Sequence, residues 1–357
     1  MANNNENKIL NVPNLRFPEF SGEWENCQIA NILSIGSGRD YKHLEKGNIP
    51  VFGTGGYMTS VNECIYDGET TFIGRKGSIN KPFYYNGKFW TVDTLFYTHS
   101  FNKTTPKFVY CLFQTINWLR YNEASGVPSL SKDTIEKIKV FIPQLDEQRK
   151  ISEMLSVIDE RIATQNKIIE KYESLIKGIA QHCIKESTSG NTYVKLGDIC
   201  QITTGKLDAN EQVDNGIYPF FTCAEQPFKI DSFAFDTEAL LISGNGANLG
   251  YINYYNGKFN AYQRTYVLDI FSENIQYIKW ALKVLLPKRI AIEKSSSNTP
   301  YIVLSTLSDL RLPIPNKSNQ CHIAKLMQSL ERKLSSQIAL NGSYNKLKQY
   351  LLRQMFI

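Results

Sequence analysis

The sequence lacks the features of a secreted or membrane-bound protein. Its seven cysteines, among 357 residues, form no Cys-x-x-C pair and are odd in number, which is typical of reduced, scattered thiols. No apolar run approaches the roughly 18 residues of a membrane span, and the first ten residues lack the apolar core of a signal peptide. We therefore expect a cytoplasmic location, with neither secretion nor membrane insertion.

Motifs of catalysis are also scarce. The four histidines show no ligand spacing, and the chain has neither a Walker sequence nor a nuclease-like carboxylate cluster with lysine. The segment GNGANLG at Gly244–Gly250 is followed by strand-like residues, whereas a cofactor loop needs a helix N-terminus there. NTPY at Asn298–Tyr301 has Thr299 where the Asn-Pro-Pro-Tyr motif of amino-methyltransferases has proline. The sequence therefore predicts no catalytic residue and no metal site.

What the sequence does contain is an internal repeat, since residues 24–184 are written again, in diverged form, in residues 193–357. The hexapeptide YYNGKF occurs at Tyr84–Phe89 and again, 170 residues later, at Tyr254–Phe259. Other matches, at offsets that grow from 167 to 172 along the chain, are Ile29 with Leu196, Gly38 with Gly205, Pro50 with Pro219, Glu69 with Glu238, Gly77 with Gly246, Pro128 with Pro300 and Gln148 with Gln320. A steadily growing offset indicates two diverged copies, each large enough to bury its own core.

Charge is distributed alike in the two copies. The net charge of +6 is modest and does not by itself indicate a nucleic-acid partner. Residues 70–92, however, hold four basic residues and no acid, and the equivalent residues 239–268 hold Lys258 and Arg264 and no acid. The same segment of each copy is therefore locally positive.

Each copy is expected to mix strands and helices, which places the protein in the α+β class. TTFIG at 70–74 predicts a strand, and Asn86-Gly87 and Asn256-Gly257 predict type I′ hairpin turns, because both turn residues need positive φ. Helices are predicted over 106–121 and 274–286. A last strand should end at Pro143 in one copy, and at Pro313 and Pro315 in the other.

Each copy ends in a heptad pattern of about five repeats. The apolar positions are Ile151, Leu155, Ile158, Ile162, Ile169, Tyr172, Ile176, Ile179 and Cys183 in the first copy, and Ile323, Met327, Leu330, Leu334, Tyr344, Leu351 and Met355 in the second. Gln165 and Gln337 fill core positions and are expected to fix the register. Leu347 is expected to take the core place of Lys348. Two such helices should pair as an antiparallel coiled coil, the alternative being that each packs along its own domain.

The expected domain organisation follows from these patterns. It comprises a lead-in at 1–23, a first domain at 24–147, a helical spacer at 148–185, a linker at 186–192, a second domain at 193–319 and a C-terminal helical spacer at 320–357. Within the two domains, equivalent turns occur in both copies, but the polar residues at their tips differ. Such variation is typical of recognition surfaces. The residues that we expect to bind DNA can donate hydrogen bonds or allow close backbone approach. They are Thr54, Gly55, Gly56, Tyr57, Arg75, Lys76, Gly77, Ser78, Trp90, Ser125 and Gly126 in the first copy, and Thr222, Cys223, Ser243, Asn245, Gly246, Gln263, Arg264, Ser296 and Asn298 in the second.

With these features the chain resembles the specificity (S) subunit of type I restriction-modification systems over essentially its whole length. VPNLRFPEFSGEW at 12–24 resembles the lead-in of that family, IPQLDEQRKI at 142–151 its domain-to-helix junction, and LKQYLLRQMF at 347–356 its C-terminal close. The second junction, IPNKSNQCHI at 314–323, departs from the pattern at Asn319.

The resemblance implies that each domain is a target recognition domain reading one half of a split double-stranded DNA site. It also implies that the paired helices set the spacer and bind two methyltransferase subunits, with restriction (motor-nuclease) subunits as further partners. S-adenosylmethionine, ATP and Mg would then be bound by those partners and not by this chain. Two other readings stay open, namely a free-standing methyltransferase or nuclease with an atypical site, and a coiled-coil scaffold that binds proteins or glycans and ignores DNA.

Overall fold

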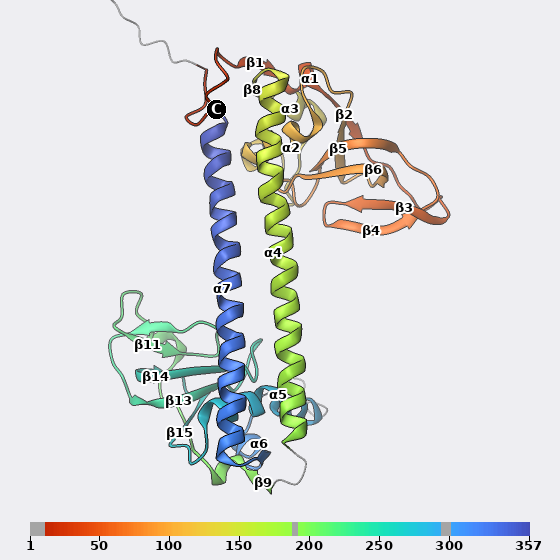
Figure 1. The fold of residues 1–357 in the computed structure, drawn as a ribbon. Coiled ribbons are helices and arrows are strands. Elements are labelled where there is room, and N and C mark those ends of the chain that lie inside the picture. Colours follow the sequence, from red (N-terminus) through yellow and green to blue (C-terminus); the bar gives the residue numbers. More distant parts are fainter. Residues whose placement is uncertain (1–10, 188–191, 294–300) are drawn as a thin grey trace, which may run out of the picture. The chain divides into compact units, whose positions relative to one another are not determined.

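The computed structural model describes residues 11–187, 192–293 and 301–357, and the chain divides into two compact units (Figure 1). Unit 1 comprises the chain up to Asn166 together with Leu340–Ile357, and unit 2 comprises Lys167–Ala339. The long helices α4 (Leu145–Glu186) and α7 (Lys317–Met355) each contribute one part to either unit. Each unit therefore contains one copy of the repeat and a part of both long helices.

The remaining elements of unit 1 precede α4. They are β1 (Glu25–Gln28), α1 (Ile29–Ile32), β2 (Ser34–Ser37), β3 (Lys46–Gly53), β4 (Gly56–Val61), β5 (Tyr66–Gly74), β6 (Phe83–Thr91), β7 (Leu95–His99), α2 (Pro106–Thr115), η1 (Trp118–Tyr121), α3 (Lys132–Glu136) and β8 (Lys139–Ile142).

The remaining elements of unit 2 lie between the two long helices. They are β9 (Thr192–Lys195), η2 (Leu196–Asp198), β10 (Gln201–Thr204), η3 (Ala209–Glu211), β11 (Tyr218–Phe221), β12 (Phe228–Ile230), β13 (Phe235–Ser243), β14 (Ile252–Ala261), β15 (Thr265–Asp269), α5 (Ile275–Glu293), α6 (Leu304–Ser308) and β16 (Arg311–Ile314).

The two units share one sheet topology, which confirms the predicted duplication. The six-stranded sheet has the order β2-β7-β5-β6-β3-β4 in unit 1 and β10-β15-β13-β14-β11-β12 in unit 2. β3 pairs with β6 in parallel, as β11 does with β14, and the neighbouring pairs are antiparallel. A two-stranded sheet, β1 with β8 or β9 with β16, joins each copy to the start of its long helix. The α+β class is therefore confirmed.

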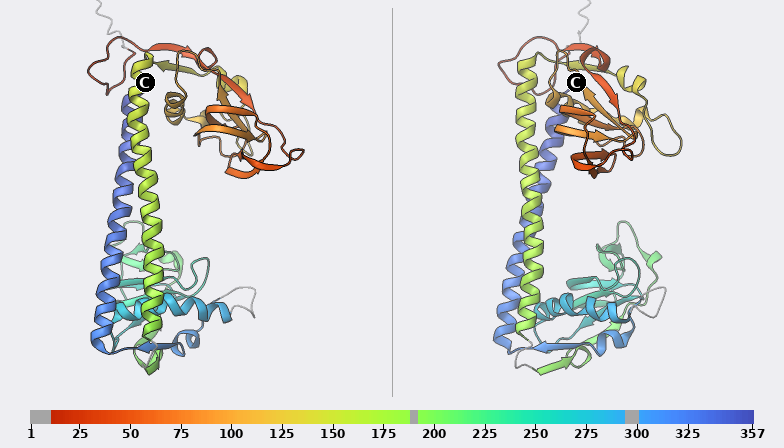
Figure 2. Two further views of the ribbon diagram at one scale, coloured as in Figure 1. Left: turned by 45° about the vertical axis from the view of Figure 1, so that its right-hand side comes forward. Right: turned by 90° about the vertical axis from the view of Figure 1, so that its right-hand side faces the viewer.

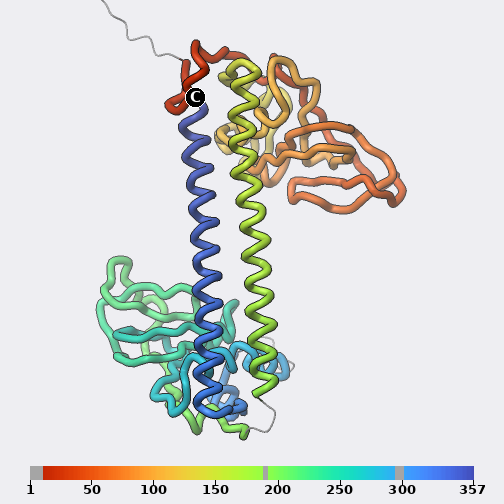
Figure 3. Tube along the Cα trace, in the orientation of Figure 1, coloured from red at the N-terminus to blue at the C-terminus, as the bar shows by residue number. Residues whose placement is uncertain are grey.

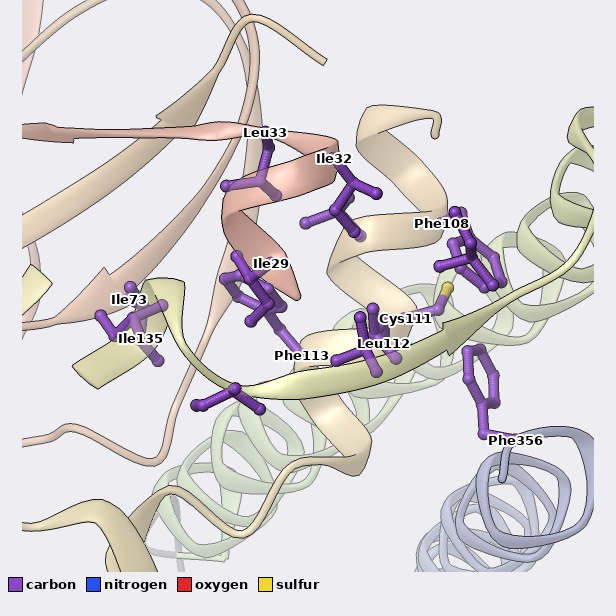
Figure 4. Close-up of a cluster of buried hydrophobic side chains, with 14 of the residues drawn as sticks. Ile29, Ile32, Leu33, Ile73, Phe108, Cys111, Leu112, Phe113, Ile135 and Phe356 are labelled. Atoms are coloured by element: carbon purple, nitrogen blue, oxygen red, sulfur yellow. The ribbon is translucent and has the colours of Figure 1, made fainter. Parts of the chain in front are cut away.

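A helix covers one face of each sheet. In unit 1, Phe108 and Leu112 of α2 join Ile73 of β5 in the main core, and Figure 4 shows this cluster together with α1 and Phe356 of α7. In unit 2, Tyr277 and Ile278 of α5 pack in the same way, and Figure 2 shows α5 beside the sheet in two views. On the opposite face of the unit 1 sheet, Phe52, Phe72, Phe89 and Leu95 of β3, β5, β6 and β7 form a second buried cluster. The β3–β4 hairpin at the edge of this sheet is traced in orange in Figure 3.

The helix predicted over 106–121 is shorter than expected. Thr105 caps α2 by accepting a hydrogen bond from Phe108 N at 3.3 Å, and Pro106 occupies the first turn, where its missing N–H costs nothing. The helix ends at Thr115 because the chain turns back to bury Trp118, whose indole N–H donates to Phe113 O at 2.8 Å. Conversely α5 runs on to Glu293, through an internal Pro287, beyond the predicted end at 286.

The hairpin turns predicted at Asn86-Gly87 and Asn256-Gly257 are wrong. Both dipeptides lie inside continuous strands, β6 and β14, and Gly87 pairs with Gly68 across the ladder. Gly87 and Gly68 have φ values of 130° and 146°, so the positive φ that glycine permits is used to distort a paired strand and not to reverse the chain. The strands predicted at 70–74 and before Pro143 are confirmed as β5 and β8, whereas Pro313 lies within β16.

The long helices run antiparallel within each unit, as predicted. In unit 1, Ile151 and Leu155 of α4 share the core with Leu351 and Met355 of α7. In unit 2, Ile176 and Ala180 of α4 pack with Met327 of α7 and Trp280 of α5. Gln165 is buried, with 5% of its surface exposed, and Gln337 is half-buried. No helix among the described residues is both long and apolar enough to cross a membrane.

The expectation that Leu347 replaces Lys348 in the helix core is wrong. The Lys348 side chain is 11% exposed and pairs with Asp159 of α4 at 2.5 Å, while Leu347 is 45% exposed. A lysine is tolerated there because Asp159 supplies the opposite charge and the Tyr110 ring lies 5.6 Å from the ammonium group.

Candidate nucleic-acid interface

Four loops of unit 1 meet at one edge of the sheet. They are the β3–β4 turn, residues 75–78 after β5, residues 92–94 after β6 and residues 123–130. Arg75 N donates to Thr94 O at 2.8 Å, and Leu130 N donates to Arg75 O at 2.9 Å. Gly77 N donates to Pro128 O at 2.8 Å, and a Cβ on Gly77 would lie 3.7 Å from Thr54 Oγ1. Backbone hydrogen bonds therefore hold the predicted residues 75–77 against Thr94 and residues 128–130.

Two of these bonds recur at the equivalent positions of unit 2. Gly244 N donates to Arg264 O at 2.9 Å, and Ile302 N donates to Gly244 O at 2.8 Å. Asn248 closes the cluster by donating from Nδ2 to Cys223 O at 3.0 Å. The frame of the loops is thus shared by both copies, whereas the side chains that it presents differ, with Arg75 where the second copy has Gly244.

The exposed basic side chains of this edge are held by few contacts. The Arg75 guanidinium donates to Asp93 O at 3.3 Å and lies 5.9 Å from the centroid of the Phe96 ring, and the residue is exposed. Lys76 and Arg264 are exposed as well. A guanidinium presented in this way can form two parallel hydrogen bonds to guanine or contact a phosphate.

The structure separates the predicted residues by accessibility. The exposed ones are Gly55, Tyr57, Arg75, Lys76, Ser78, Ser125, Gly126, Gly246, Gln263 and Arg264, and the half-buried ones are Thr54, Gly56, Gly77, Cys223 and Asn245. Thr222 and Ser243 are buried, at 7% and 2% exposure. Trp90 is 7% exposed, and its indole N–H donates to Arg39 O at 3.0 Å, so it supports the loops from within. Ser296 and Asn298 lie outside the described residues.

One pair of basic residues at this edge is absent from the predicted set. Arg39 follows Gly38, is exposed, and donates its backbone N–H to Thr91 O at 2.8 Å beside the Trp90 indole. At the equivalent position of the second copy stands Lys206, also exposed, after Gly205. The signal was present in the sequence, because a basic residue follows the matched glycine in both copies.

Two further kinds of site, a metal centre and a cofactor-binding loop, are not found among the described residues. Within the described residues, no group of three or more histidines, cysteines and acidic residues could hold a metal ion. The residues Gly244–Gly250 lead into β14, as expected, so that no helix N-terminus follows this glycine-rich turn.

The duplicated topology, with equivalent loop clusters in both copies, defines a protein made of two similar modules. A family model described as "Type I restriction modification DNA specificity domain" matches the chain twice, over residues 21–174 and 188–341. The chain belongs to this family.

Similar proteins are named as specificity subunits of type I restriction enzymes. The chain is 41% identical over 143 residues to the type I restriction enzyme EcoDI specificity subunit of Escherichia coli, a match that covers 40% of this chain and 32% of the relative. It is 24% identical over 258 residues to the MjaVIII specificity subunit of Methanocaldococcus jannaschii, covering 58% and 59%. The matches therefore span about a third to three-fifths of these two relatives.

The fold is shared along the whole chain with a solved structure. The crystal structure of a type I restriction-modification system S subunit from M. genitalium superimposes with a TM-score of 0.73 and 18% identity, covering 97% of this chain and 99% of that one. A structure from work on complex assembly of the type I restriction-modification system matches with a TM-score of 0.55 and 16% identity. At these identities the similarity concerns the fold.

Proposed function

We propose that this chain is the DNA-specificity subunit of a type I restriction-modification complex, and that it performs no reaction itself. The observation that carries the proposal is the pair of equivalent loop clusters, which have one backbone frame and different exposed side chains, in a chain that belongs to the DNA specificity family. Each copy would read one half of a bipartite site in double-stranded DNA, with base contacts made by the exposed tips.

The partners and cofactors follow from this role. Two methyltransferase subunits would dock on the paired long helices, and restriction subunits would join the assembly. The complex would act on DNA in the cytoplasm. S-adenosylmethionine, ATP and Mg would be bound by those partners. A target adenine must leave the base stack to be methylated. We therefore assign sequence recognition to this chain and methylation to the methyltransferase subunit.

The two long helices would set the spacer between the half-sites. In support, α4 has 42 residues and α7 has 39, which corresponds to roughly 60 Å of helix at 1.5 Å per residue. A protein that reads two half-sites needs a stiff element between its two recognition domains, because the half-sites lie at a fixed separation on the duplex.

The test is to map methylated adenines in DNA exposed to the complex of this chain with its methyltransferase subunit. A bipartite motif is expected, and replacing residues 24–144 by another target recognition domain should change one half of it and leave the other intact. If both halves changed, the two copies would not read independently.

The same assay separates the alternatives. The purified chain alone should neither methylate with S-adenosylmethionine nor cleave with Mg, and activity in either test would make it an enzyme. A salt-dependent gel shift of DNA with the assembled complex is expected, and its absence would favour a scaffold that ignores DNA.

Arg75 and Arg264 give the sharpest residue test. Replacing either with alanine should weaken recognition of one half-site by about 1 to 3 kcal/mol if the guanidinium contacts guanine in bidentate fashion. Unchanged affinity and unchanged motif for both variants would make them ordinary surface residues.

A further inference from the structure

A buried glycine followed by an exposed basic residue occurs at the same place in both copies. In unit 1 these residues are Gly38 and Arg39, and in unit 2 they are Gly205 and Lys206. We call Arg39 and Lys206 the edge basic pair. Each of them follows the first strand of its six-stranded sheet, β2 or β10, so the pair lies outside the four loops whose tips differ between the copies.

In unit 1 the backbone of Arg39 is fixed against the loop that follows β6. A Cβ on Gly38 would lie 2.0 Å from Val92 O, so only glycine permits this close approach of two backbone segments. Arg39 N donates to Thr91 O at 2.8 Å, and Arg39 O accepts from the Trp90 indole N–H at 3.0 Å. The Arg39 side chain therefore leaves an anchored backbone beside one loop of the candidate interface.

In unit 2 the segment of Lys206 lies against the equivalent loop, after β14. A Cβ on Gly205 would lie 1.9 Å from Ala261 O, so glycine is required here as well. One residue after Lys206, Leu207 O accepts from Gln263 N at 2.9 Å. Both copies thus use a glycine contact and backbone hydrogen bonds to place a basic residue beside the same loop.

The positive charge of the edge basic pair is kept in both copies, unlike that of the other basic residues described at this edge. Each of those residues has a neutral residue at the equivalent position, the matched residues being Arg75 with Gly244, Lys76 with Asn245 and Arg264 with Thr94. Side chains that differ suit half-sites of different sequence. A charge kept in both copies suits a feature that both half-sites share, and the phosphate backbone is the part of DNA that carries no sequence information directly.

No contact inside the protein explains why this charge is kept. In the part of the chain that the structure describes, neither the Arg39 guanidinium nor the Lys206 ammonium group forms an ion pair or a hydrogen bond. The fold uses the glycine and the backbone of the residue after it, and an uncharged side chain would leave those backbone bonds in place. Exposed guanidinium and ammonium groups are good phosphate ligands.

We propose that Arg39 and Lys206 each bind a phosphate of the DNA backbone and hold the duplex against the loops that read bases. This inference rests on the proposed function. It assigns sequence-independent affinity to the edge basic pair and sequence reading to tip residues such as Arg75 and Arg264. Each phosphate contact releases condensed counterions, so this part of the affinity falls as the salt concentration rises.

The test measures DNA binding by the complex of the full chain with its methyltransferase subunit. Arg39→Gln, Lys206→Gln and the double variant remove one or two charges and keep a long polar side chain at each position. Affinity is measured at several salt concentrations for a duplex that contains the mapped motif and for an unrelated duplex. Methylated adenines are mapped with each variant.

Each single variant should reduce the slope of log affinity against log salt concentration by about 0.9, and the double variant by about 1.8, for both duplexes. At 0.1 M salt, each lost contact should weaken binding roughly eightfold. The methylated motif should stay the same. Arg39→Lys and Lys206→Arg keep the charge and should retain most of the slope, which distinguishes a lost phosphate contact from a folding defect.

The matched control is Lys139→Gln combined with Arg311→Gln. These exposed residues are also basic in both copies, but they lie on the two-stranded sheets, in β8 and β16. Removing two charges there should leave the slope unchanged. An equal reduction in the control would show that net charge is responsible, and the inference would fall.

Two further results would overturn the inference. One is an unchanged slope in the double variant. The other is a changed motif, or a loss of affinity confined to the duplex with the motif, since either would make Arg39 and Lys206 base-reading residues. If the complex of the unaltered chain showed no salt-dependent DNA binding at all, the proposed function itself would be refuted, so the two failures are distinguishable.

Discussion

Two buried glutamines hold the junction between each sheet domain and its long helix. Gln148 is fully buried, donates from Nε2 to Pro143 O and Lys103 O at 2.8 Å each, and accepts from Thr105 N at 3.1 Å. Gln320 repeats two of these bonds, donating to Pro315 O at 2.9 Å and accepting from Asn274 N at 3.0 Å. Each glutamine thus ties the first turn of α4 or α7 to the N-cap of α2 or α5.

Replacing Gln148 with leucine should lower the free energy of unfolding by about 2 to 4 kcal/mol, because Pro143 O, Lys103 O and Thr105 N lose the buried side chain that bonds them. Urea denaturation of the full chain provides the measurement. Gln144→Leu is the control, since Gln144 is exposed, and it should have little effect. Equal stability of the Gln148 and Gln144 variants would mean that water replaces the glutamine.

Two cysteines of unit 1 should differ sharply in reactivity. Cys111 is 2% exposed, and burial, with a smaller contribution from Asp159, raises its thiol pKa to about 12. Cys64 is exposed. Because the thiolate is the nucleophile, an alkylating reagent at pH 8 should modify Cys64 rapidly and Cys111 only on unfolding. Mass spectrometry of the digested protein locates the label, and Cys64→Ser should remove the fast phase. Rapid labelling of Cys111 in the folded chain would contradict the packing of α2.

Among the elements, the long helices differ in how the two units pack them. In unit 1 the ion pair of Lys348 with Asp159 joins α7 to α4 in addition to their apolar contacts. In unit 2, Ile176 of α4 packs with Met327 of α7 and Trp280 of α5. An ion pair in a helix core adds little to stability beyond what an apolar pair gives, yet removing one partner is costly.

Lys348→Leu alone should therefore destabilise the chain by about 1 to 3 kcal/mol. This range is reduced because Asp159 is partly exposed. The double variant Asp159→Leu with Lys348→Leu should recover most of the lost stability. Thermal unfolding of both single variants and the double variant gives the coupling energy. Lys346→Leu, at an exposed position of α7, is the matched control. Additive effects of the two substitutions would show that the pair is not coupled.

The elements also show what the sequence could and could not predict. The repeat and the heptads are long-range patterns, so the duplicated fold and the paired helices were predictable. The hairpin turn predicted at Asn86-Gly87 was wrong because the positive φ of Gly87 belongs to a distorted strand, and this distortion depends on the facing Gly68. Lys348 misled because its partner, Asp159, lies far away in the sequence. The role of the loop tips in DNA binding stays a prediction, and the burial of Trp90 was missed because it depends on the Arg39 segment that covers this side chain.

On the scale of the whole molecule, the described part of the lead-in meets the C-terminal end of α7 within unit 1. Leu15 N donates to Gln354 O at 2.8 Å, and the Trp24 ring lies 6.1 Å from that of Phe356, edge to face. Arg16 pairs with Glu147 at 2.7 Å, next to the start of α4. In the sequence, residues 188–191 link α4 to β9, whereas in unit 1 the lead-in is joined to the ends of α4 and α7 by the contacts of Leu15 and Arg16.

The proposed role of the long helices in setting the spacer between the half-sites can be tested by lengthening both helices. The units divide at Asn166 in α4 and at Ala339 in α7, so a seven-residue insertion at both points adds one heptad to each helix and leaves the contacts inside each unit in register. The inserted complex should methylate a site with the same half-site sequences and a longer spacer, since seven residues add roughly 10 Å of helix, about three base pairs of duplex. Methylation mapping measures this. An insertion in α4 alone is the control, and it should lower stability because it shifts one helix against the other. An unchanged spacer in the doubly inserted complex would show that the helices do not set it.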